Sequence, residues 1–166
     1  MNWCCKSCGE THRDPPLCFA CAPPWLGMVP EDEFDQRVIL TDDVCIVDNQ
    51  HFFLRGHIAL PILEFGDPLC FSAWVSLSQA SMERVTARWD DADRASDSPY
   101  FGWLCSEVPC YPSTMHLKTS VQSELPGRVS RITLEPTDHP FSRDQADGIT
   151  IDRWHAIAHQ LLHATP

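Results

Sequence analysis

Four short runs between residues 37 and 77 have the composition of β-strands. In the last of these runs, from Phe71 to Leu77, every second residue is apolar, so a strand there would have one apolar face. Asp48-Asn49 is typical of a tight turn between two strands. One-faced strands joined by tight turns favour antiparallel pairing. The expected strands are Arg37–Leu40, Val44–Val47, Phe52–Leu60 and Cys70–Leu77.

Helical spacing replaces this alternation in two longer segments. Ser78 is suited to cap a helix that runs to about Trp89, because its hydroxyl accepts a hydrogen bond from an unpaired N–H of the first turn. In the same way Thr150 is suited to cap a helix over Ile151–Ala164, which carries an apolar stripe. A short helix is expected from Pro30, since proline and the carboxylates that follow favour a helix start.

Three later runs also have strand character, and they complete the predicted domain. Between the first helix and these runs, residues 90–99 are polar and acidic, which predicts a mobile connector. The whole pattern predicts an α+β domain over residues 25–166, with a mostly antiparallel sheet of about five to seven strands packed by the two main helices. Residues 1–24 show no periodicity and form a separate small module. The later strands are expected at Tyr100–Cys105, His116–Val121 and Val129–Leu134.

The charge of the chain narrows the classes of partner. With 23 acidic and 12 basic residues, the formal net charge is −11. Such a surface repels phosphate backbones and anionic membranes, so neither nucleic acid nor a membrane is expected as a partner. The same field attracts basic surfaces, and a basic protein is the predicted partner.

The cysteines indicate a reducing compartment. The sequence opens with no basic start and apolar stretch of a secretory signal, so a cytoplasmic location is expected. Nine cysteines in that setting are expected to be free thiols or metal ligands rather than disulfides.

Two CxxC pairs in the first 24 residues predict a zinc site. Each pair can wrap a turn so that two thiolates point at one cation, and two turns complete a tetrahedral site. Four protein ligands leave no open position, so this zinc would be structural. Cys4 and His12 are alternative ligands of suitable type. The predicted ligands are Cys5, Cys8, Cys18 and Cys21.

Histidines near the C-terminus offer a second set of possible ligands. His155, His159 and His163 are four residues apart and share one face of the predicted helix with Asp152. The HExxH arrangement of metalloproteases is absent, because Ala156 follows His155. These histidines are therefore interpreted as a polar helix face, with a second metal as the alternative.

A cysteine and histidine catalytic site is the rival to a binding function. Cys105 or Cys110 would supply a thiolate, with His116 or His139 as the base. Asp138 precedes His139, but neighbours in an extended segment point to opposite faces, so Asp138 is not expected to orient that imidazole. No catalytic residue is assigned on this basis.

Several runs of residues carry a resemblance to a known family. They include Cys5-Lys6-Ser7-Cys8-Gly9-Glu10 with His12, His51-Phe52-Phe53-Leu54-Arg55-Gly56 and Trp74-Val75-Ser76-Leu77-Ser78. The most specific runs are Tyr100-Phe101-Gly102-Trp103-Leu104 and Leu134-Glu135-Pro136-Thr137-Asp138-His139-Pro140. Through these runs, nearly the whole chain resembles a bacterial family known as domain of unknown function 2199. The first 24 residues resemble short zinc ribbons with two knuckles.

The sequence as a whole predicts a non-enzymatic binding protein stabilised by zinc. Its acidic character suits an immunity protein or antitoxin that binds a basic partner. The alternative is a small hydrolase that depends on a Cys/His pair or on a metal. A binding protein needs an exposed complementary face, whereas an enzyme needs titratable groups that converge in a pocket.

Overall fold

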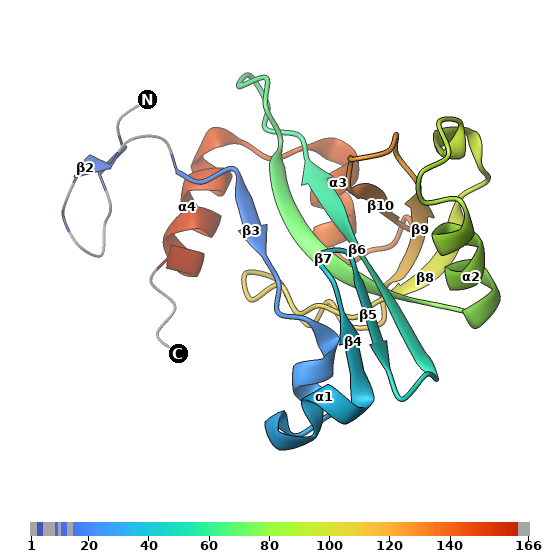
Figure 1. The fold of residues 1–166 in the computed structure, drawn as a ribbon. Helices are drawn as coiled ribbons and strands as arrows, with labels where there is room; N and C mark the ends of the chain where they lie inside the picture. The colour runs from blue at the N-terminus through green and yellow to red at the C-terminus, as the bar shows by residue number, and fades with distance from the viewer. Residues whose placement is uncertain (1–2, 5–8, 10, 13–14, 163–166) are drawn as a thin grey trace.

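The computed structural model describes residues 3–4, 9, 11–12 and 15–162 of the 166-residue chain. One large sheet and several helices around it form an α+β fold (Figure 1), which confirms the predicted class. Within the described residues, none of the helices has the length and apolar character needed to cross a membrane.

The described elements follow the chain in this order. Strands β1 (Trp3–Cys4) and β2 (Thr11–His12) form a ladder of their own. The main sheet contains β3 (Cys18–Ala20), β4 (Val38–Leu40), β5 (Val44–Val47), β6 (His51–Leu60), β7 (Leu69–Leu77), β8 (Tyr100–Leu104), β9 (Lys118–Gln122) and β10 (Ser130–Leu134). The helices are α1 (Phe34–Arg37), α2 (Gln79–Ala87), α3 (Pro140–Asp147) and α4 (Ile151–Leu162), and the 3-10 helices are η1 (Pro24–Gly27), η2 (Glu31–Glu33) and η3 (Arg94–Ser96).

Strands β6 to β10 close into a five-stranded barrel. Each strand pairs antiparallel with the next, and β10 returns to lie parallel to β6, with Ser130 opposite Gly56. Strand β3 is also parallel to its neighbour β7. The predicted sheet is therefore corrected: it is mostly antiparallel, but it closes on itself and includes two parallel pairs. Period-2 alternation shows which face of a strand is buried, not which strand lies beside it.

A glycine allows the barrel to close. A Cβ on Gly56 would lie 2.6 Å from Ile132 Cγ1 and 2.9 Å from the Ser130 carbonyl oxygen. The backbones of β6 and β10 approach at this point because residue 56 has no side chain.

Alternating residues of the barrel strands fill its interior. Phe71 on β7 packs edge to face against Phe141 on α3, with ring centroids 5.5 Å apart. Such pairs stabilise a core beyond the area that they bury. The largest fully buried side chains include Leu54, Ile58, Leu60, Leu69, Leu104, Ile132, Trp154 and Ile157.

A second, smaller apolar cluster lies outside the barrel. The β4–β5 hairpin extends the sheet beyond β6, and Asp48 and Asn49 in the turn between β5 and β6 both have φ of 53°, as the predicted tight turn requires. Trp74, on the outer face of β7, is buried in this cluster. The other buried members are Val29, Val38, Cys45, Val47 and Phe53.

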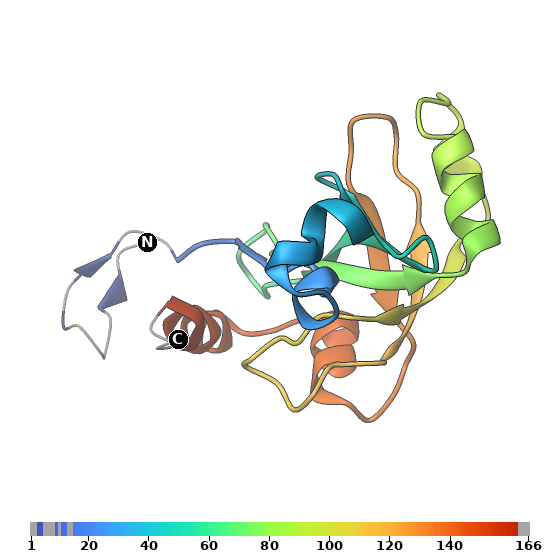
Figure 2. The ribbon, with the colours of Figure 1, turned by 60° about the horizontal axis from the view of Figure 1, so that its bottom comes forward.

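The two main helices begin where the sequence predicts. The Ser78 hydroxyl accepts a hydrogen bond of 3.1 Å from the Ser81 N–H, and the Thr150 hydroxyl accepts one of 3.1 Å from the Arg153 N–H. Both caps satisfy N–H groups of a first helical turn. Helices α2 and α4 lie on opposite sides of the main sheet (Figure 2).

Helix α3 was not predicted from the sequence pattern. His139 caps it, since its Nδ1 accepts a hydrogen bond of 3.1 Å from the Phe141 N–H. Gln145 then bonds to the edge of β10: its Oε1 accepts from the Leu134 N–H at 2.7 Å, and its Nε2 donates to the Ile132 carbonyl at 2.9 Å. The helix depends on these tertiary contacts.

The acidic connector is held by two arginines, which corrects the prediction that it is mobile. Arg88 forms ion pairs with Asp91, Asp93 and Asp97 at 3.1, 2.9 and 2.8 Å. Arg94 is 4% exposed and donates hydrogen bonds to four backbone carbonyls. Internal counter-charges and a buried arginine therefore order a segment whose composition is typical of a loop.

Candidate functional site

A surface groove of about 490 Å³ lies between η1 and the segment that joins β8 to β9. Residues 105–107 and 115–116 of that segment form one side, and the proline-rich stretch that leads into η1 forms the other. Phe53 of β6 also lines the groove. The groove is lined by Cys21, Ala22, Pro23, Pro24, Leu26, Gly27, Met28, Phe53, Cys105, Ser106, Glu107, Met115 and His116.

The lining is mainly apolar and accessible. Leu26 is 57% exposed and Met28 is 38% exposed, although both are large apolar side chains. Methionine is flexible and polarisable, so it adapts to varied apolar surfaces. A smaller hollow of about 400 Å³, lined by Ser76, Trp103, Cys105 and His116, shares two residues with the groove. The two hollows form one continuous surface through Cys105 and His116.

An aromatic pair extends this surface along β8. Phe101 and Trp103 are 51% and 40% exposed, and their rings meet edge to face at 5.2 Å. Tyr100, Gly102 and Leu104 alternate with them and face the barrel interior. The sequence analysis missed this pair as a site, although the alternation itself places two aromatic side chains on the outer face of the strand.

Hydrogen bonds within residues 105–116 hold the groove wall. The Ser106 hydroxyl accepts from the Trp74 N–H at 2.9 Å, and the Ser106 carbonyl accepts from the Thr114 hydroxyl at 2.7 Å. Glu107 accepts from the Ser113 hydroxyl at 2.6 Å and from the Thr114 N–H at 3.0 Å. These two hydrogen bonds, with a smaller contribution from His116, hold the pKa of the Glu107 carboxyl below its usual range. The wall is thus pre-organised.

The groove brings together one of the cysteine and histidine pairs that the sequence considers. Cys105 and His116 both line it, whereas Cys110 and His139 do not. Burial raises the pKa of the Cys105 thiol, and its sulfur lies 3.4 Å from the Trp103 carbonyl oxygen. A nucleophilic cysteine needs the opposite shift, because the thiolate is the reactive form.

The other candidate groups have structural roles. Burial raises the pKa of the Cys110 thiol to about 11. His139 caps α3 through Nδ1, and its Nε2 lies 3.3 Å from the Pro112 carbonyl oxygen. Asp138 pairs with Arg143 rather than with the imidazole that follows it. The expectation that Asp138 does not orient His139 is confirmed.

The predicted metal ligands fall partly outside the described residues. Cys5, Cys8 and His163 lie outside them, as do the side chains of Cys4 and His12. In the part of the chain that the structure describes, no group of three or more His, Cys, Asp or Glu side chains is arranged to hold a metal ion.

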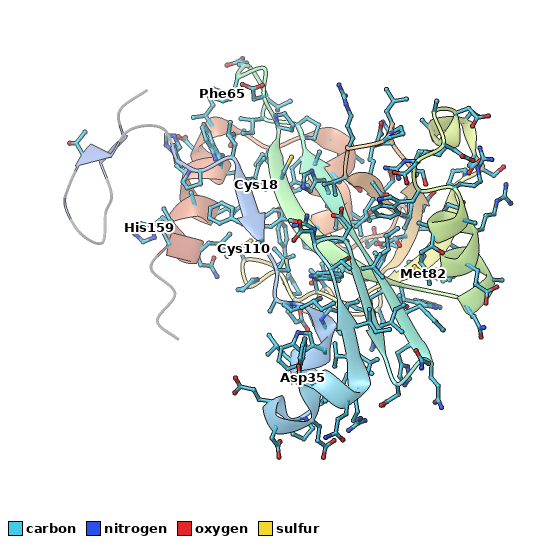
Figure 3. The ribbon with its side chains drawn as sticks, viewed as in Figure 1. Cys18, Asp35, Phe65, Met82, Cys110 and His159 are labelled. Carbon is cyan, nitrogen blue, oxygen red and sulfur yellow. The ribbon has the colours of Figure 1, made fainter. Side chains whose placement is uncertain are left out.

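The second CxxC pair has the conformation of a strand. Cys18 opens β3 and is exposed (Figure 3), and Cys21, half-buried, directly follows this strand and lines the groove. Residues 18–20, which the sequence assigns to the N-terminal module, are thus part of the main sheet.

His155 and His159 lie on α4, and both are half-buried. The ring of His155 lies 5.4 Å from that of Trp154. Trp154 in turn donates from its indole to the Pro16 carbonyl at 3.2 Å, which ties α4 to the N-terminal part of the chain.

An acidic segment follows η1 in the chain. The Trp25 ring of η1 meets the Phe34 ring of α1 at 4.6 Å, so residues 31–35 lie beside η1. Glu31, Asp32 and Asp35 in this segment are exposed. Figure 3 shows Asp35 at α1, in the lower part of the view.

A comparison with known protein families identifies the family of this chain. The family model described as "Uncharacterized protein conserved in bacteria (DUF2199)" matches residues 4–149. The chain belongs to this family. The match includes both sides of the groove and ends before α4, so His155 and His159 lie beyond it. Neither the curated proteins nor the solved structures contain a match to this chain.

Proposed function

We propose that this DUF2199 protein is a non-enzymatic binding protein that recognises a partner protein through its groove. The observation that carries the proposal is the set of exposed apolar side chains at two adjoining hollows: Leu26 and Met28 line one, and Trp103, which Phe101 contacts, lines the other. Interfaces are enriched in aromatic residues and methionine, and exposed apolar patches mark binding sites. The hydrogen-bonded wall beside it would keep the ordering cost of binding low.

The charge of the molecule supports a basic partner. The net charge is −11, and the exposed carboxylates of residues 31–35 follow closely in the chain after Leu26 and Met28 of the groove. In the connector, by contrast, Arg88 already pairs with Asp91, Asp93 and Asp97. The acidic contact is therefore assigned to Glu31, Asp32 and Asp35. An immunity protein or antitoxin would use such a surface to occupy the basic site of a toxin.

A structural zinc ion in the N-terminal module is the second part of the proposal. The Cys5-Lys6-Ser7-Cys8-Gly9 sequence has knuckle spacing, and the β1–β2 ladder brackets it in the chain, with Trp3 opposite His12. Zinc bound by four thiolates would be closed to substrate and would act by stabilising the fold.

Hydrolysis by a Cys/His pair is the less favoured alternative. Its support is the shared position of Cys105 and His116 in the groove. The raised pKa of Cys105 argues against it, because few thiolates would form at neutral pH.

Site-specific photo-crosslinking in bacterial cells that express this chain tests the binding function. A photoreactive phenylalanine analogue replaces Trp103 in one variant and the exposed Leu125, outside the groove, in a matched control. The expected result is a covalent adduct with a basic protein from position 103 only. Adducts that are equal at both positions, or absent at position 103, would contradict the proposal.

The purified pair then tests the role of charge. Replacing Glu31, Asp32 and Asp35 by their amides should slow association and flatten its salt dependence, since steering scales with charge near the interface. Replacing Asp91, Asp93 and Asp97 by asparagine is the matched control, and it should change association less. The opposite order would place the contact on the connector.

A further inference from the structure

Glu107 supplies the charge of the groove. Among the described residues that line the groove, it is the one with an Asp, Glu, Lys or Arg side chain. Most of the other lining residues are apolar, and they include Leu26, Met28 and Met115. Glu107 itself is exposed, so a partner in the groove reaches it from solvent. In a mainly apolar site the few fixed polar groups set orientation and specificity, so specificity in this groove depends first on Glu107.

Two donors on the same segment fix the Glu107 carboxylate. Its Oε1 accepts from the Ser113 hydroxyl at 2.6 Å, and its Oε2 accepts from the Thr114 N–H at 3.0 Å. The Thr114 side chain is fully buried, and its hydroxyl oxygen accepts from the Val108 N–H at 3.0 Å. The carboxylate is therefore oriented before a partner arrives, which lowers the entropy cost of binding.

The carboxylate keeps one acceptor position on each oxygen. An ionised carboxylate has about four lone-pair positions, and within the described residues the Ser113 hydroxyl and the Thr114 N–H each use one. The Thr114 hydroxyl also lies 3.4 Å from Glu107 Oε2, but it donates its single hydrogen to the Ser106 carbonyl at 2.7 Å. Two parallel acceptors match the fork of an arginine guanidinium, whereas a lysine ammonium is a point charge. The remaining positions therefore favour arginine over lysine.

The charge of Glu107 disfavours other side chains at this point. The hydrogen bonds from Ser113 and Thr114 hold the pKa of the Glu107 carboxyl below its usual range, so this group is ionised at neutral pH. An apolar segment that covered the groove would remove water from this charge. A buried charge without a partner is costly, and a second carboxylate opposite it would add repulsion. A segment with a cationic side chain at this point avoids both costs.

We propose that Glu107 is the residue that determines specificity in the groove, and that it binds an arginine side chain of a partner segment whose apolar residues contact Leu26 and Met28. This inference rests on the proposed binding function and adds the chemistry of the bound segment. Carboxylates of the acidic segment 31–35 would act on the rate of association, whereas a charge paired inside the interface acts on dissociation. Loss of Glu107 therefore changes a different quantity from loss of the segment 31–35 charges.

Short random peptides displayed on phage and selected on the immobilised full chain are the probe. Selected peptides that also crosslink through the photoreactive analogue at position 103 bind at the groove. In these peptides each arginine is replaced in turn by citrulline, which is neutral and has nearly the same shape. One replacement is expected to weaken binding to the wild-type chain about tenfold and to have little effect on binding to Glu107→Gln. Lysine at the same position should restore only part of the affinity.

The outcomes separate the inference from the binding function on which it rests. Groove-binding peptides without an arginine, or with equal citrulline effects on the wild-type chain and Glu107→Gln, would overturn the inference while the binding function stands. A selection that yields no groove-binding peptide would count against the binding function and the inference together.

Two further variants separate the charge of Glu107 from the structure of the groove wall. Thr114→Val removes the hydroxyl that bonds to Ser106 and Val108 but leaves the Glu107 charge in place. It should lower stability and keep the preference for arginine over citrulline. Glu83→Gln removes an exposed carboxylate on α2, outside the groove, and should leave both affinity and preference unchanged. A preference lost in either variant as fully as in Glu107→Gln would overturn the inference.

Discussion

The guanidinium of Arg94 lies 5.0 Å from the centre of the Trp89 ring, and its Nη1 donates a 2.6 Å hydrogen bond to the Trp89 carbonyl oxygen. The same side chain donates to the carbonyl oxygens of Glu124, Leu125 and Arg128. One buried arginine thus joins the end of α2 to the loop between β9 and β10. Carbonyl oxygens and a ring face, in place of water, stabilise its charge.

Arg94→Met is expected to lower the free energy of unfolding by about 2 to 4 kcal/mol, because four carbonyl oxygens lose their donor. Urea denaturation followed by fluorescence measures this change. The control is Arg128→Met, at an exposed position, with an expected change within about 0.5 kcal/mol. Equal effects of the two substitutions would show that Arg94 does not hold the loop.

Gly56→Ala is expected to destabilise the barrel by about 2 kcal/mol, because the new methyl group overlaps Ile132 and the Ser130 carbonyl. Gly27→Ala is the matched control, since a Cβ there meets no atom within 4 Å. Combining Gly56→Ala with Ile132→Val should recover only part of the loss, because the clash with the Ser130 backbone remains. Thermal unfolding compares the variants, and full recovery would contradict this account of closure.

Gln145→Leu is expected to cost about 1 to 3 kcal/mol, because the Leu134 N–H and the Ile132 carbonyl lose their partner. Gln160→Leu removes one hydrogen bond, to the Pro109 carbonyl, from an exposed side chain and should cost less than 1 kcal/mol, about the net value of such a bond. Hydrogen exchange of the α3 amides measures the stability of this helix separately from that of the whole fold. Unchanged protection in Gln145→Leu would mean that α3 is held by its apolar contacts alone.

Glu107→Gln should reduce stability at neutral pH but not in acid. The folded state lowers the pKa of this carboxyl, so its charged form stabilises the fold fully above the ordinary glutamate pKa of about 4.3. That contribution is lost as the pH falls through the lower, folded-state pKa. The difference in unfolding free energy between wild type and variant should therefore be largest above about pH 5 and shrink below it. An NMR titration in which Glu107 has a midpoint at or above 4.3 would contradict the argument.

Local features of the chain were predictable because neighbouring residues determine them. The strand at Val44–Val47 and the Asp48-Asn49 turn are present as predicted. The caps at Ser78 and Thr150 are present because each hydroxyl bonds within three residues of itself. Such interactions need no distant partner, so the sequence alone indicates them.

Helix α3 shows the limit of local patterns. Residues Pro140–Asp147 contain few apolar side chains, and only Phe141 enters the core deeply. The cap that starts the helix is a histidine, which is not among the usual N-cap residues. Contacts of Gln145 with β10 stabilise the helix, and these appear only when the strand is in place.

The sequence by itself determined the α+β class, the positions of most strands and helices, and the net charge of −11. The tertiary structure decided that the sheet closes through Gly56 and Ser130, that Cys18 lies beside Cys70, and that η1, Phe53 and residues 105–107 and 115–116 line one groove. Alternation tells which face of a strand is apolar, because side chains repeat every two residues. The choice of neighbouring strand depends instead on fit between segments far apart in the chain, and only the folded barrel brings those segments together.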